Sequence, residues 1–215
     1  GTIITSPPVK KETKPFELPP KNDNMRRVYA YLVKHRGIDS EVLNAFVRAN
    51  MIYESADYHN AVFVGYDKDG VPRHAHKRST GQNSTFKGNV DSCNPEYSFH
   101  WNGSGNRLYL FEAPIDMLSF ISMHKEKWKT QNYAACCGVS DRVMWQMIKD
   151  NPNIHTVCLC LDNDEAGQLA NKRISEKLTQ KGIRTENLVP ARKDWNEVLL
   201  YQNEEGEEQC QALVL

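Results

Sequence analysis

The sequence lacks an excess of charge of either sign, any long apolar run and any regular spacing of cysteines. Lys and Arg together number 27, and Asp and Glu also number 27, so the formal net charge is zero. This excludes the strongly basic class that binds nucleic acid through its overall charge, and leaves only local basic patches. No apolar run approaches the ~20 residues that a membrane-spanning helix needs, and no signal-peptide pattern is present. We therefore expect a cytoplasmic protein without a membrane partner.

The six cysteines form no Cys-x-x-Cys motif. Cys136 and Cys137 are adjacent, while Cys158 and Cys160 alternate with leucines. This pattern is typical of small hydrophobic core residues in a reducing compartment, so no zinc site is expected among them. The composition, 40% hydrophobic and 25% charged, is that of an ordinary globular protein. The chain begins with Gly1 rather than Met, so we expect the natural protein to extend further upstream.

The sequence is predicted to start with an arm and a small domain. Residues 1–24 are rich in proline and lysine and poor in large apolar residues, as in a linker or disordered arm. Residues 25–103 are predicted to form an α+β accessory domain. It would contain two helices, at 25–35 and 39–50, and a β-hairpin at 61–79. The two helices could form a helix-turn-helix DNA reader, but packing against the following sheet is the better interpretation.

Residues 104–200 alternate strand patterns with helix patterns, and residues 201–215 form an acidic tail that we expect to be solvated. The predicted strands are 107–113, 133–139, 154–162 and 183–189, and the predicted helices between them are 114–128, 141–151 and 164–182. Strands that alternate with helices predict a parallel sheet with helices on both faces. The predicted fold class is therefore α/β, preceded by the small α+β domain.

Acidic residues at the strand ends are the feature that points to chemistry. The apolar run IHTVCLCL leads directly into Asp162 and Asp164. Ligand sites in such sheets gather beyond the carboxyl ends of the strands, so Glu112, Gly138 and Asp194, which follow the other strands, should meet them at one edge. Carboxylates that come this close repel one another unless a cation or a proton intervenes.

An oxygen-only cluster of this kind suits Mg²⁺ or Mn²⁺ better than zinc. Two such ions would stabilise the attacking and leaving oxygens of phosphoryl transfer. Asp-x-Asp alone is weak evidence for a metal site, because acids are also favoured at helix N-termini. Its combination with Glu112 is much more specific. His74 and His76 could form a metal pair on the hairpin, but a solvated strand face is the better interpretation.

The basic candidates lie upstream of the acids, on the hairpin and in the loop that follows it. Arg73, Lys77, Arg78 and Lys87 could form an electropositive stripe near the acidic edge. Such a stripe would bind a phosphate backbone in a salt-dependent manner. The alternative is an ordinary exposed strand face without a ligand.

Four stretches, LYLFEAPIDMLSF, AACCGVS, VCLCLDNDEAG and KDWNEVL, resemble the Toprim domain in the version found in bacterial replicative primases. Upstream, VFVGYDKDGVPRHAHKRS and FKGN are similar to the hairpin and basic loop that precede this domain in primases. The whole arrangement resembles Toprim-containing, primase-like proteins of bacterial plasmids and conjugative elements. The resemblance implies a Rossmann-like Toprim sheet and Mg²⁺-dependent (or Mn²⁺-dependent) chemistry on nucleic acid.

The resemblance also implies roles for individual residues. Glu112 matches the Toprim glutamate, a metal ligand or general acid/base. Asp162 and Asp164 match the two aspartates that hold Mg²⁺. Asp116 and Asp194 match further acidic positions and are additional metal candidates.

A second set implied by the resemblance concerns phosphate binding. Gly138 matches a glycine that lets a backbone or phosphate approach closely. The candidate phosphate-binding residues are Arg73, Lys77, Arg78, Lys87, Gly138 and Lys193. Two departures from the primase pattern are Ala113, where primases place Gly, and Asn163, which stands where Gly separates the aspartates. Neither removes an acid, but the first changes the approach of a substrate.

We therefore predict a Mg²⁺-dependent Toprim domain that performs primase-like nucleotidyl transfer during replication or transfer of mobile DNA. The expected partners are single-stranded DNA and nucleotides, together with other replication or conjugation proteins. One alternative is a metal-dependent nuclease, because the same acids can orient water in place of a hydroxyl. The other is a nucleic-acid-binding module without catalysis.

Overall fold

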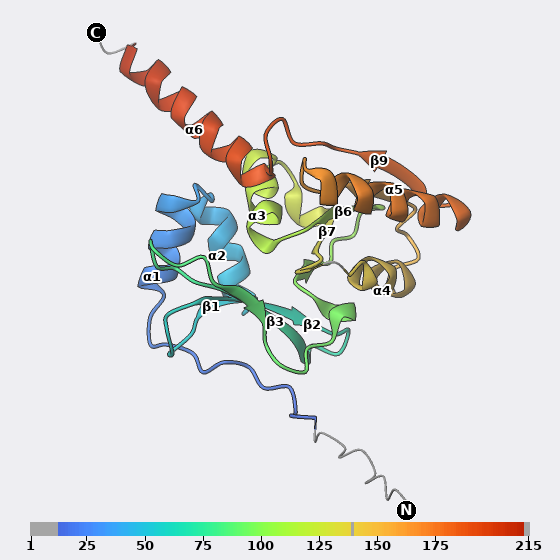
Figure 1. Cartoon of the computed structure of the whole chain (residues 1–215), viewed down its shortest axis with the longest axis horizontal. Coiled ribbons are helices and arrows are strands. Elements are labelled where there is room, and N and C mark those ends of the chain that lie inside the picture. Colours follow the sequence, from blue (N-terminus) through green and yellow to red (C-terminus); the bar gives the residue numbers. More distant parts are fainter. Residues whose placement is uncertain (1–12, 139, 213–215) are drawn as a thin grey trace, which may run out of the picture.

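The computed structural model describes residues 13–138 and 140–212, which fold around two β-sheets (Figure 1). One sheet is antiparallel and belongs to the N-terminal unit, and the other is mostly parallel and belongs to the C-terminal unit. A single apolar cluster crosses between them: Val28 and Phe46 from the N-terminal helices pack in the same core as Phe63, Phe111 and Leu118. This shared core fixes the two units against each other.

The N-terminal unit is α+β, as predicted. Its elements are α1 (Arg26–Tyr29), the π-helix η1 (Ala30–His35), α2 (Ser40–Arg48), β1 (Ile52–Glu54), β2 (Ala61–Tyr66), β3 (Pro72–Arg78), β4 (Lys87–Asn89) and the short 3₁₀ helix η2 (Pro95–Tyr97). The strands pair in the order β1-β2-β3-β4. Helix α2 begins after the N-cap Asp39, whose carboxylate accepts hydrogen bonds from the backbone N–H groups of Glu41 and Val42. Its apolar face is buried in the shared core, which agrees with the packing interpretation.

The part of the expected linker that the structure describes, residues 13–24, lies against the antiparallel sheet instead of being detached. Phe16 and Leu18 pack on the outer apolar face of that sheet. The hydroxyl of Tyr53 donates to the carbonyl of Pro19 at 2.5 Å. Apolar contacts and hydrogen bonds, including those between the backbones of Asn22 and Glu54 and of Ala56 and Pro20, thus tie this segment to the sheet although its composition resembles that of a linker.

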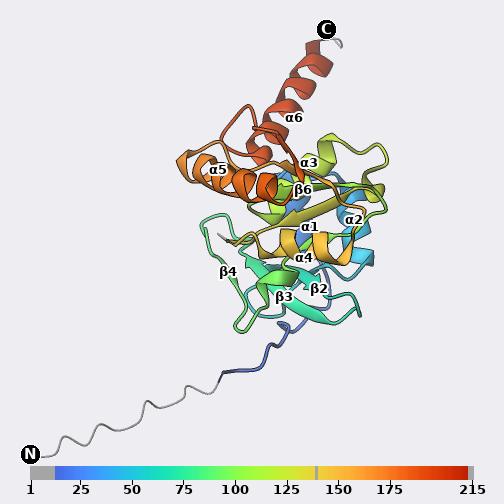
Figure 2. The same ribbon diagram turned by 90° about the vertical axis from the view of Figure 1, so that its right-hand side faces the viewer.

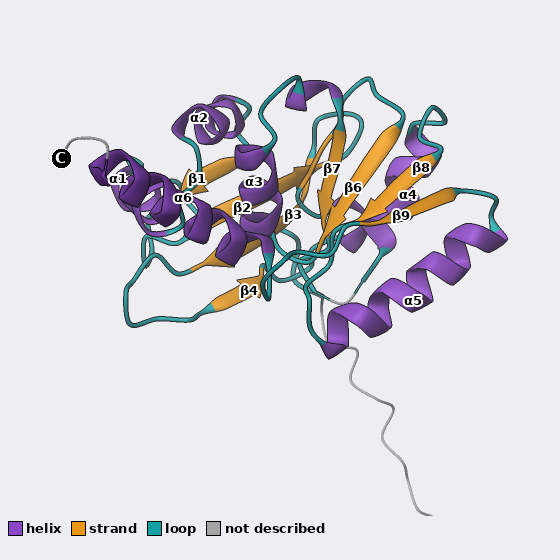
Figure 3. Cartoon of the chain, turned by 90° about the horizontal axis from the view of Figure 1, so that it is seen from above, coloured by secondary structure: helices purple, strands orange, loops and turns teal. Residues whose placement is uncertain are grey.

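The C-terminal unit confirms the predicted α/β fold (Figure 3). Its elements are β5 (His100–Trp101), β6 (Arg107–Phe111), α3 (Pro114–Met123), the 3₁₀ helix η3 (Trp128–Thr130), β7 (Asn132–Ala135), α4 (Arg142–Asp150), β8 (Thr156–Leu159), α5 (Glu165–Gln180), β9 (Arg184–Asn187) and α6 (Trp195–Ala212). The sheet order is β5-β7-β6-β8-β9, with β7, β6, β8 and β9 parallel and β5 antiparallel to β7. The parallel strands therefore end at one edge.

Helices cover both faces of this sheet, because its strands are apolar on both sides. Helices α4 and α5 bury Val143 and Ile174 against Leu108 and Leu110 of β6. Helix α3 and the start of α6 cover the opposite face, within the shared core. The cysteines Cys136, Cys137, Cys158 and Cys160 are buried, as predicted.

Helix α6 continues through the segment expected to be an acidic tail. Residues 201–207 are helical and exposed, and the helix projects from the body of the molecule (Figures 1 and 2). Among the described residues, no helix is both long and apolar enough to span a membrane.

The histidines of β3 depart from the sequence-based interpretation. His74 and His76 are both buried, so the prediction of a solvated strand face was wrong. They lie opposite Gly65 and Phe63 of β2, on the side of the sheet that faces the shared core. No three histidine, cysteine, aspartate or glutamate side chains form a metal site in the described part of the chain, so the metal-pair alternative gains no support here.

Candidate active site at the carboxyl edge of the parallel sheet

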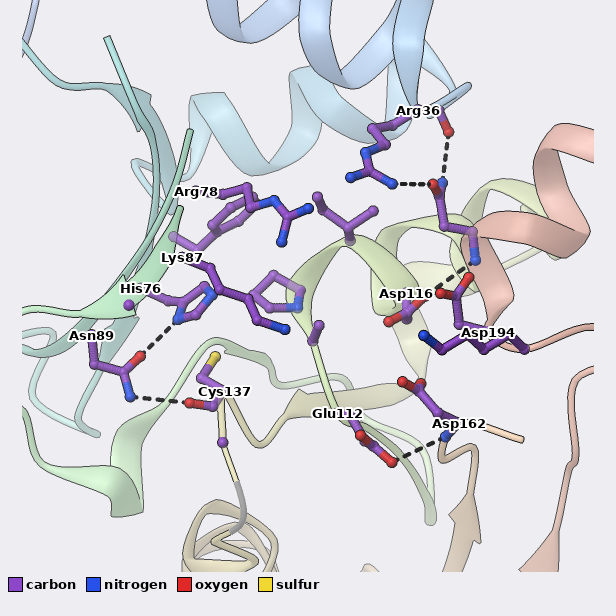
Figure 4. Close-up of a pocket in the computed structure, with 18 residues that line it drawn as sticks. Arg36, His76, Arg78, Lys87, Asn89, Glu112, Asp116, Cys137, Asp162 and Asp194 are labelled. Carbon is purple, nitrogen blue, oxygen red and sulfur yellow. Dashed lines mark hydrogen bonds between the residues drawn. The ribbon is translucent and has the colours of Figure 1, made fainter. Parts of the chain in front are cut away.

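A cleft of about 590 Å³ lies at the carboxyl edge of the parallel sheet. Its acidic lining consists of Glu112, Asp116, Asp162 and Asp194. These residues follow different strands or open different helices, so the fold brings together four of the five acids singled out from the sequence. Figure 4 shows their carboxyl groups on one side of the cleft.

Glu112 and Asp162 form the centre of the acidic side. Glu112 follows β6 directly, and its Oε1 accepts a hydrogen bond of 3.2 Å from the backbone N–H of Asp162. Gly167 in the first turn of α5 packs against this pair, because an added Cβ would lie 2.0 Å from the carbonyl oxygen of Asp162 and 3.1 Å from Oε1 of Glu112. The close approach explains why glycine is required at this point of α5.

The other acids stand at helix N-termini. Asp116 lies in the first turn of α3 and accepts a hydrogen bond of 3.1 Å from the backbone N–H of Asn196. Asp194 accepts the N–H of Glu197 at 2.8 Å at the start of α6. Partial positive charge at a helix N-terminus favours carboxylates in such places.

Asp164 is placed differently from the other four. Its Oδ1 accepts the N–H of Gly167 at 2.8 Å and caps α5, and it does not line the cleft. The capping role alone accounts for an acid at this position. Its negative charge still acts on the site, because it helps to raise the pKa values of Glu112 and Asp162.

Basic side chains of the protein compensate the acids of the cleft only weakly: Lys193 lowers the pKa of Asp162 and Lys87 lowers that of Glu112, but burial raises both by more. Among the described residues, none of these acids forms a salt bridge with a lysine or arginine. Burial, followed by the charges of Glu112 and Asp194, raises the pKa of Asp162 to about 7. Burial, followed by the charges of Asp194 and Asp162, raises the pKa of Asp116 to about 8. Burial also raises the pKa of Glu112.

These residues fit a hard divalent cation. The Oδ1 atom of Asp162 is buried and has no hydrogen-bond partner among the described residues, which is costly unless a proton or a metal ion meets it. No three candidate ligands converge on one point within residues 13–138 and 140–212. Mg²⁺, however, is commonly held by one or two carboxylates, with water and substrate phosphates completing its shell. Asp162 together with Glu112 supplies such a donor set.

Basic side chains line the opposite side of the cleft. Arg78 of β3 and Lys87 of β4 are among them, whereas Lys193, which also lines the cleft, directly precedes Asp194 and lies on the acidic side, where its charge lowers the pKa of Asp162. Arg36, which follows η1, also lines it and was not identified from the sequence, because nothing in the helical pattern marks its direction. Figure 4 shows Arg36, Arg78 and Lys87 extending into the cleft across from the acids.

Two predicted phosphate-binding residues lie elsewhere. Arg73 does not line the cleft and pairs with Asp67 at 2.8 Å in the turn of the hairpin. Lys77 points to the other face of β3, where its Nζ lies 5.7 Å from the centre of the Phe86 ring. Side chains alternate along a strand, so Lys77 and Arg78 cannot share a face.

The floor of the cleft joins the two units. His76 of β3 contacts Asn89 of β4 through Nδ1 and Oδ1 at 2.7 Å, and the Asn89 amide donates to the carbonyl of Cys137 at 3.0 Å. Cys137 has a positive φ of 52°, a conformation that costs free energy for a residue with a side chain. Gly138 follows it at the rim, with a φ of 150° and open space around its α-carbon.

Comparison with protein families matches both units. Residues 109–199 match the model of a family described as Toprim-like. Residues 30–105 match the model of a family described as a protein of unknown function, DUF3991. The boundary between the two matches falls close to the start of β6.

Curated relatives share part of the sequence. An uncharacterized Bacillus anthracis protein, pXO2-78, is 26% identical over 162 residues, which cover 69% of this chain and 46% of that protein. The uncharacterized protein MG010 of Mycoplasma genitalium is 33% identical over 103 residues, which cover 46% of this chain and 44% of that protein. The chain spans about half the length of the curated relatives it matches.

Solved structures share the fold. The primase fragment of the bacteriophage T7 primase-helicase protein superimposes with a TM-score of 0.62 at 20% identity, covering 82% of this chain and 72% of that one. The zinc-binding and RNA polymerase domains of the Aquifex aeolicus primase give a TM-score of 0.58 at 16% identity, covering 89% of this chain and 56% of that one. The DnaG catalytic core superimposes with a TM-score of 0.56 at 16% identity, covering 86% of this chain and 73% of that one.

Proposed function

Because this chain carries a Toprim-like domain preceded by a DUF3991 domain, we propose that it catalyses Mg²⁺-dependent, primase-like nucleotidyl transfer on single-stranded DNA. The observation that carries the proposal is the two-sided cleft. Unpaired carboxylates at the ends of parallel strands face arginine and lysine side chains across one space. The primase folds of the solved relatives support this choice of reaction.

The acidic side would hold the metal and handle the proton. Asp162, with its unpartnered Oδ1, and Glu112 are the proposed ligands of Mg²⁺, with Asp116 and Asp194 close enough to affect them electrostatically. Bound there, Mg²⁺ would neutralise negative charge that develops on phosphoryl oxygens. In its alternative role as the general base, Glu112 would accept the proton of a primer 3′-hydroxyl. Asp164 is proposed to support this pair as the cap of α5.

The basic side would bind the phosphates. Arg78, Lys87 and Lys193 line the cleft and pair with no carboxylate among the described side chains. They can therefore contact a nucleotide or a DNA backbone without breaking an ion pair. Gly138, which has open space around it, lets a backbone or phosphate come close to the end of β7. Catalysis of this kind consists mainly of positioning and electrostatic stabilisation.

A labelled primer annealed to a longer single-stranded template tests the proposal. Incubation with nucleotides and Mg²⁺ is expected to extend the primer, and EDTA is expected to stop the reaction. Asp162→Asn should abolish extension and weaken Mn²⁺ binding measured by calorimetry. Asp150→Asn removes an exposed carboxylate at the end of α4, outside the cleft, and should leave both unchanged.

The same experiment separates the alternatives. Shortened DNA in the absence of nucleotides would replace the proposal by a metal-dependent nuclease. DNA binding that is indifferent to Mg²⁺ and to Asp162→Asn, without any change in length, would replace it by a binding module. We further propose that the reaction serves replication or transfer of mobile DNA, with other replication proteins as partners, which pull-down of the full-length protein with its DNA would test.

A further inference from the structure

Two arginines of the cleft are held by one tyrosine hydroxyl. Tyr31 of η1 is 8% exposed, and its hydroxyl oxygen accepts the Nε–H of Arg36 at 3.0 Å and the Nε–H of Arg78 at 3.2 Å. The guanidinium of Arg36 also lies over the Tyr31 ring, 5.4 Å from its centre. Residues from η1 and from β3, distant in the chain, are thereby fixed beside each other.

Asn196 fixes the same arginine from the Toprim-like side. It is 3% exposed, and its Oδ1 accepts Nη1 of Arg36 at 3.0 Å while its Nδ2 donates to the Arg36 carbonyl at 2.8 Å. The same Nδ2 donates to Ser119 of α3 at 3.0 Å. Rotating the amide by 180° would place its NH₂ group against the Arg36 Nη1 donor and its oxygen against the Arg36 carbonyl. The amide therefore has one favourable orientation, and it holds the Arg36 side chain in place.

The pinned guanidiniums still have donors to offer. Arg78 makes no hydrogen bond other than that to Tyr31 among the described side chains, and Arg36 uses only Nε and Nη1. Neither forms a salt bridge there. Both line the cleft and extend into it (Figure 4). Two planar donors with the Nε edge occupied can present only their Nη groups, which suits the oxygens of a phosphate.

We propose that Arg36 and Arg78 form a phosphate receptor, called here the two-arginine receptor, which is supplied by the DUF3991 unit and positioned by Tyr31 and Asn196. It rests on the proposed function, which it deepens by assigning the DUF3991 unit a direct part in substrate binding. Its ligand is a phosphate group carried either by a nucleoside triphosphate or by a nucleic-acid backbone. Tyr31 and Asn196 are positioning residues, because they act through the arginines.

Binding measured by calorimetry tests the receptor without relying on turnover. The probes are ATP, inorganic pyrophosphate and a short oligothymidylate, each titrated into the full chain in Mg²⁺ buffer. Tyr31→Phe keeps the ring beneath Arg36 but removes the hydroxyl that holds both arginines. Asn196→Ala releases Arg36 but not Arg78, and it also removes the hydrogen bond to Ser119. We expect each variant to lower the affinity for the phosphate ligand by about tenfold, which corresponds to the loss of roughly one charge-assisted hydrogen bond.

Two controls are matched to these variants. Tyr29→Phe also removes a hydroxyl near the N-terminal helices, one bonded to Asn44 and outside the cleft, and should leave binding unchanged. Arg73→Ala removes an arginine of β3 that lies outside the cleft and should leave binding unchanged. Arg78→Ala removes an arginine of the same strand that lines the cleft and should weaken binding. A circular dichroism spectrum of each variant verifies folding, and Arg36→Ala repeats the test if Tyr31→Phe does not fold.

The probes separate the two phosphate sources. If the variants bind ATP and pyrophosphate more weakly than the wild type does, the receptor binds the phosphates of the nucleotide. If only the affinity for the oligonucleotide falls, the receptor binds the nucleic-acid backbone. Wild-type binding that Tyr31→Phe, Asn196→Ala and Arg36→Ala all leave unchanged would overturn the receptor and leave nucleotidyl transfer standing. A wild-type protein that binds none of the probes would overturn both together.

Discussion

The buried carboxyl group of Asp116 gives a prediction about stability that depends on pH and needs no substrate. Asp116 is 7% exposed, and burial, followed by the charges of Asp194 and Asp162, raises its pKa from 3.8 to about 8. The unfolded chain releases this proton near pH 3.8, whereas the folded protein keeps it up to pH 8. The folded state thus binds more protons across this window, and the free energy of unfolding should fall as pH rises through it.

The size of the effect follows from the same values. A pKa difference of one unit is worth about 1.4 kcal/mol, so the gross cost of the ionised Asp116 side chain above pH 8 is about 6 kcal/mol. Proton uptake by neighbouring carboxyl groups relieves part of this cost, so we expect Asp116→Asn to raise the free energy of unfolding at pH 9 by about 2–4 kcal/mol. Asparagine keeps an oxygen that can accept the N–H of Asn196.

Urea denaturation in EDTA at pH 5 and pH 9 checks this expectation. At pH 5 the gain should be smaller, about 1–2 kcal/mol, because the unfolded wild-type chain is already ionised about 1.2 pH units above its own pKa while the folded protein is still protonated at this site. Asp67→Asn serves as a control of opposite sign, since a hydrogen bond from Arg73 lowers the pKa of Asp67 and its removal should not stabilise the protein. A gain equal at both pH values, or no gain at pH 9, would refute the electrostatic account of the acidic cleft.

Further predictions concern the elements that hold the site in place. Gly167→Ala should lower the free energy of unfolding by about 1–3 kcal/mol or more, because its Cβ would meet the carbonyl of Asp162, whereas Gly206→Ala in exposed α6 should raise it slightly, by about 0.5–1 kcal/mol; urea titration measures both. Trp195→Phe removes the hydrogen bond of 3.0 Å from Nε1 to the Cys160 carbonyl and should cost about 1–3 kcal/mol in the same assay.

Strand and helix periodicity was sufficient to predict the parallel sheet and its helices. The apolar runs that end before Glu112 and Asp162 are buried strands, and the acids lie at their carboxyl ends as the rule for open α/β sheets requires. The sequence-based prediction was less successful where tertiary contacts decide. The predicted helix 114–128 ends at Met123, and the two-residue strand β5 has no pattern long enough to detect.

The basic side of the cleft was only partly predictable for a related reason. Alternation along β3 separates Lys77 from Arg78, but which face meets the cleft depends on how the hairpin packs against the other unit. Arg36 gave no signal at all, because its direction is set by Tyr31 and by Asn196, which lies 160 residues away. Contacts between units of this kind leave no periodic trace in a sequence.

The arrangement of charge explains why the cleft needs both units. The Toprim-like unit alone would present an acidic edge whose carboxyl groups raise one another's pKa values. Such an edge attracts a cation but repels phosphates. Of the basic residues that line the cleft, Lys193 belongs to the Toprim-like unit, whereas Arg36, Arg78 and Lys87 come from the unit preceding it. If Mg²⁺ and a phosphate bind as proposed, the positive ion would offset the charge of the carboxyl groups and the anion would offset that of the basic side chains. Anion binding and cation binding should therefore be positively coupled, each increasing the affinity for the other.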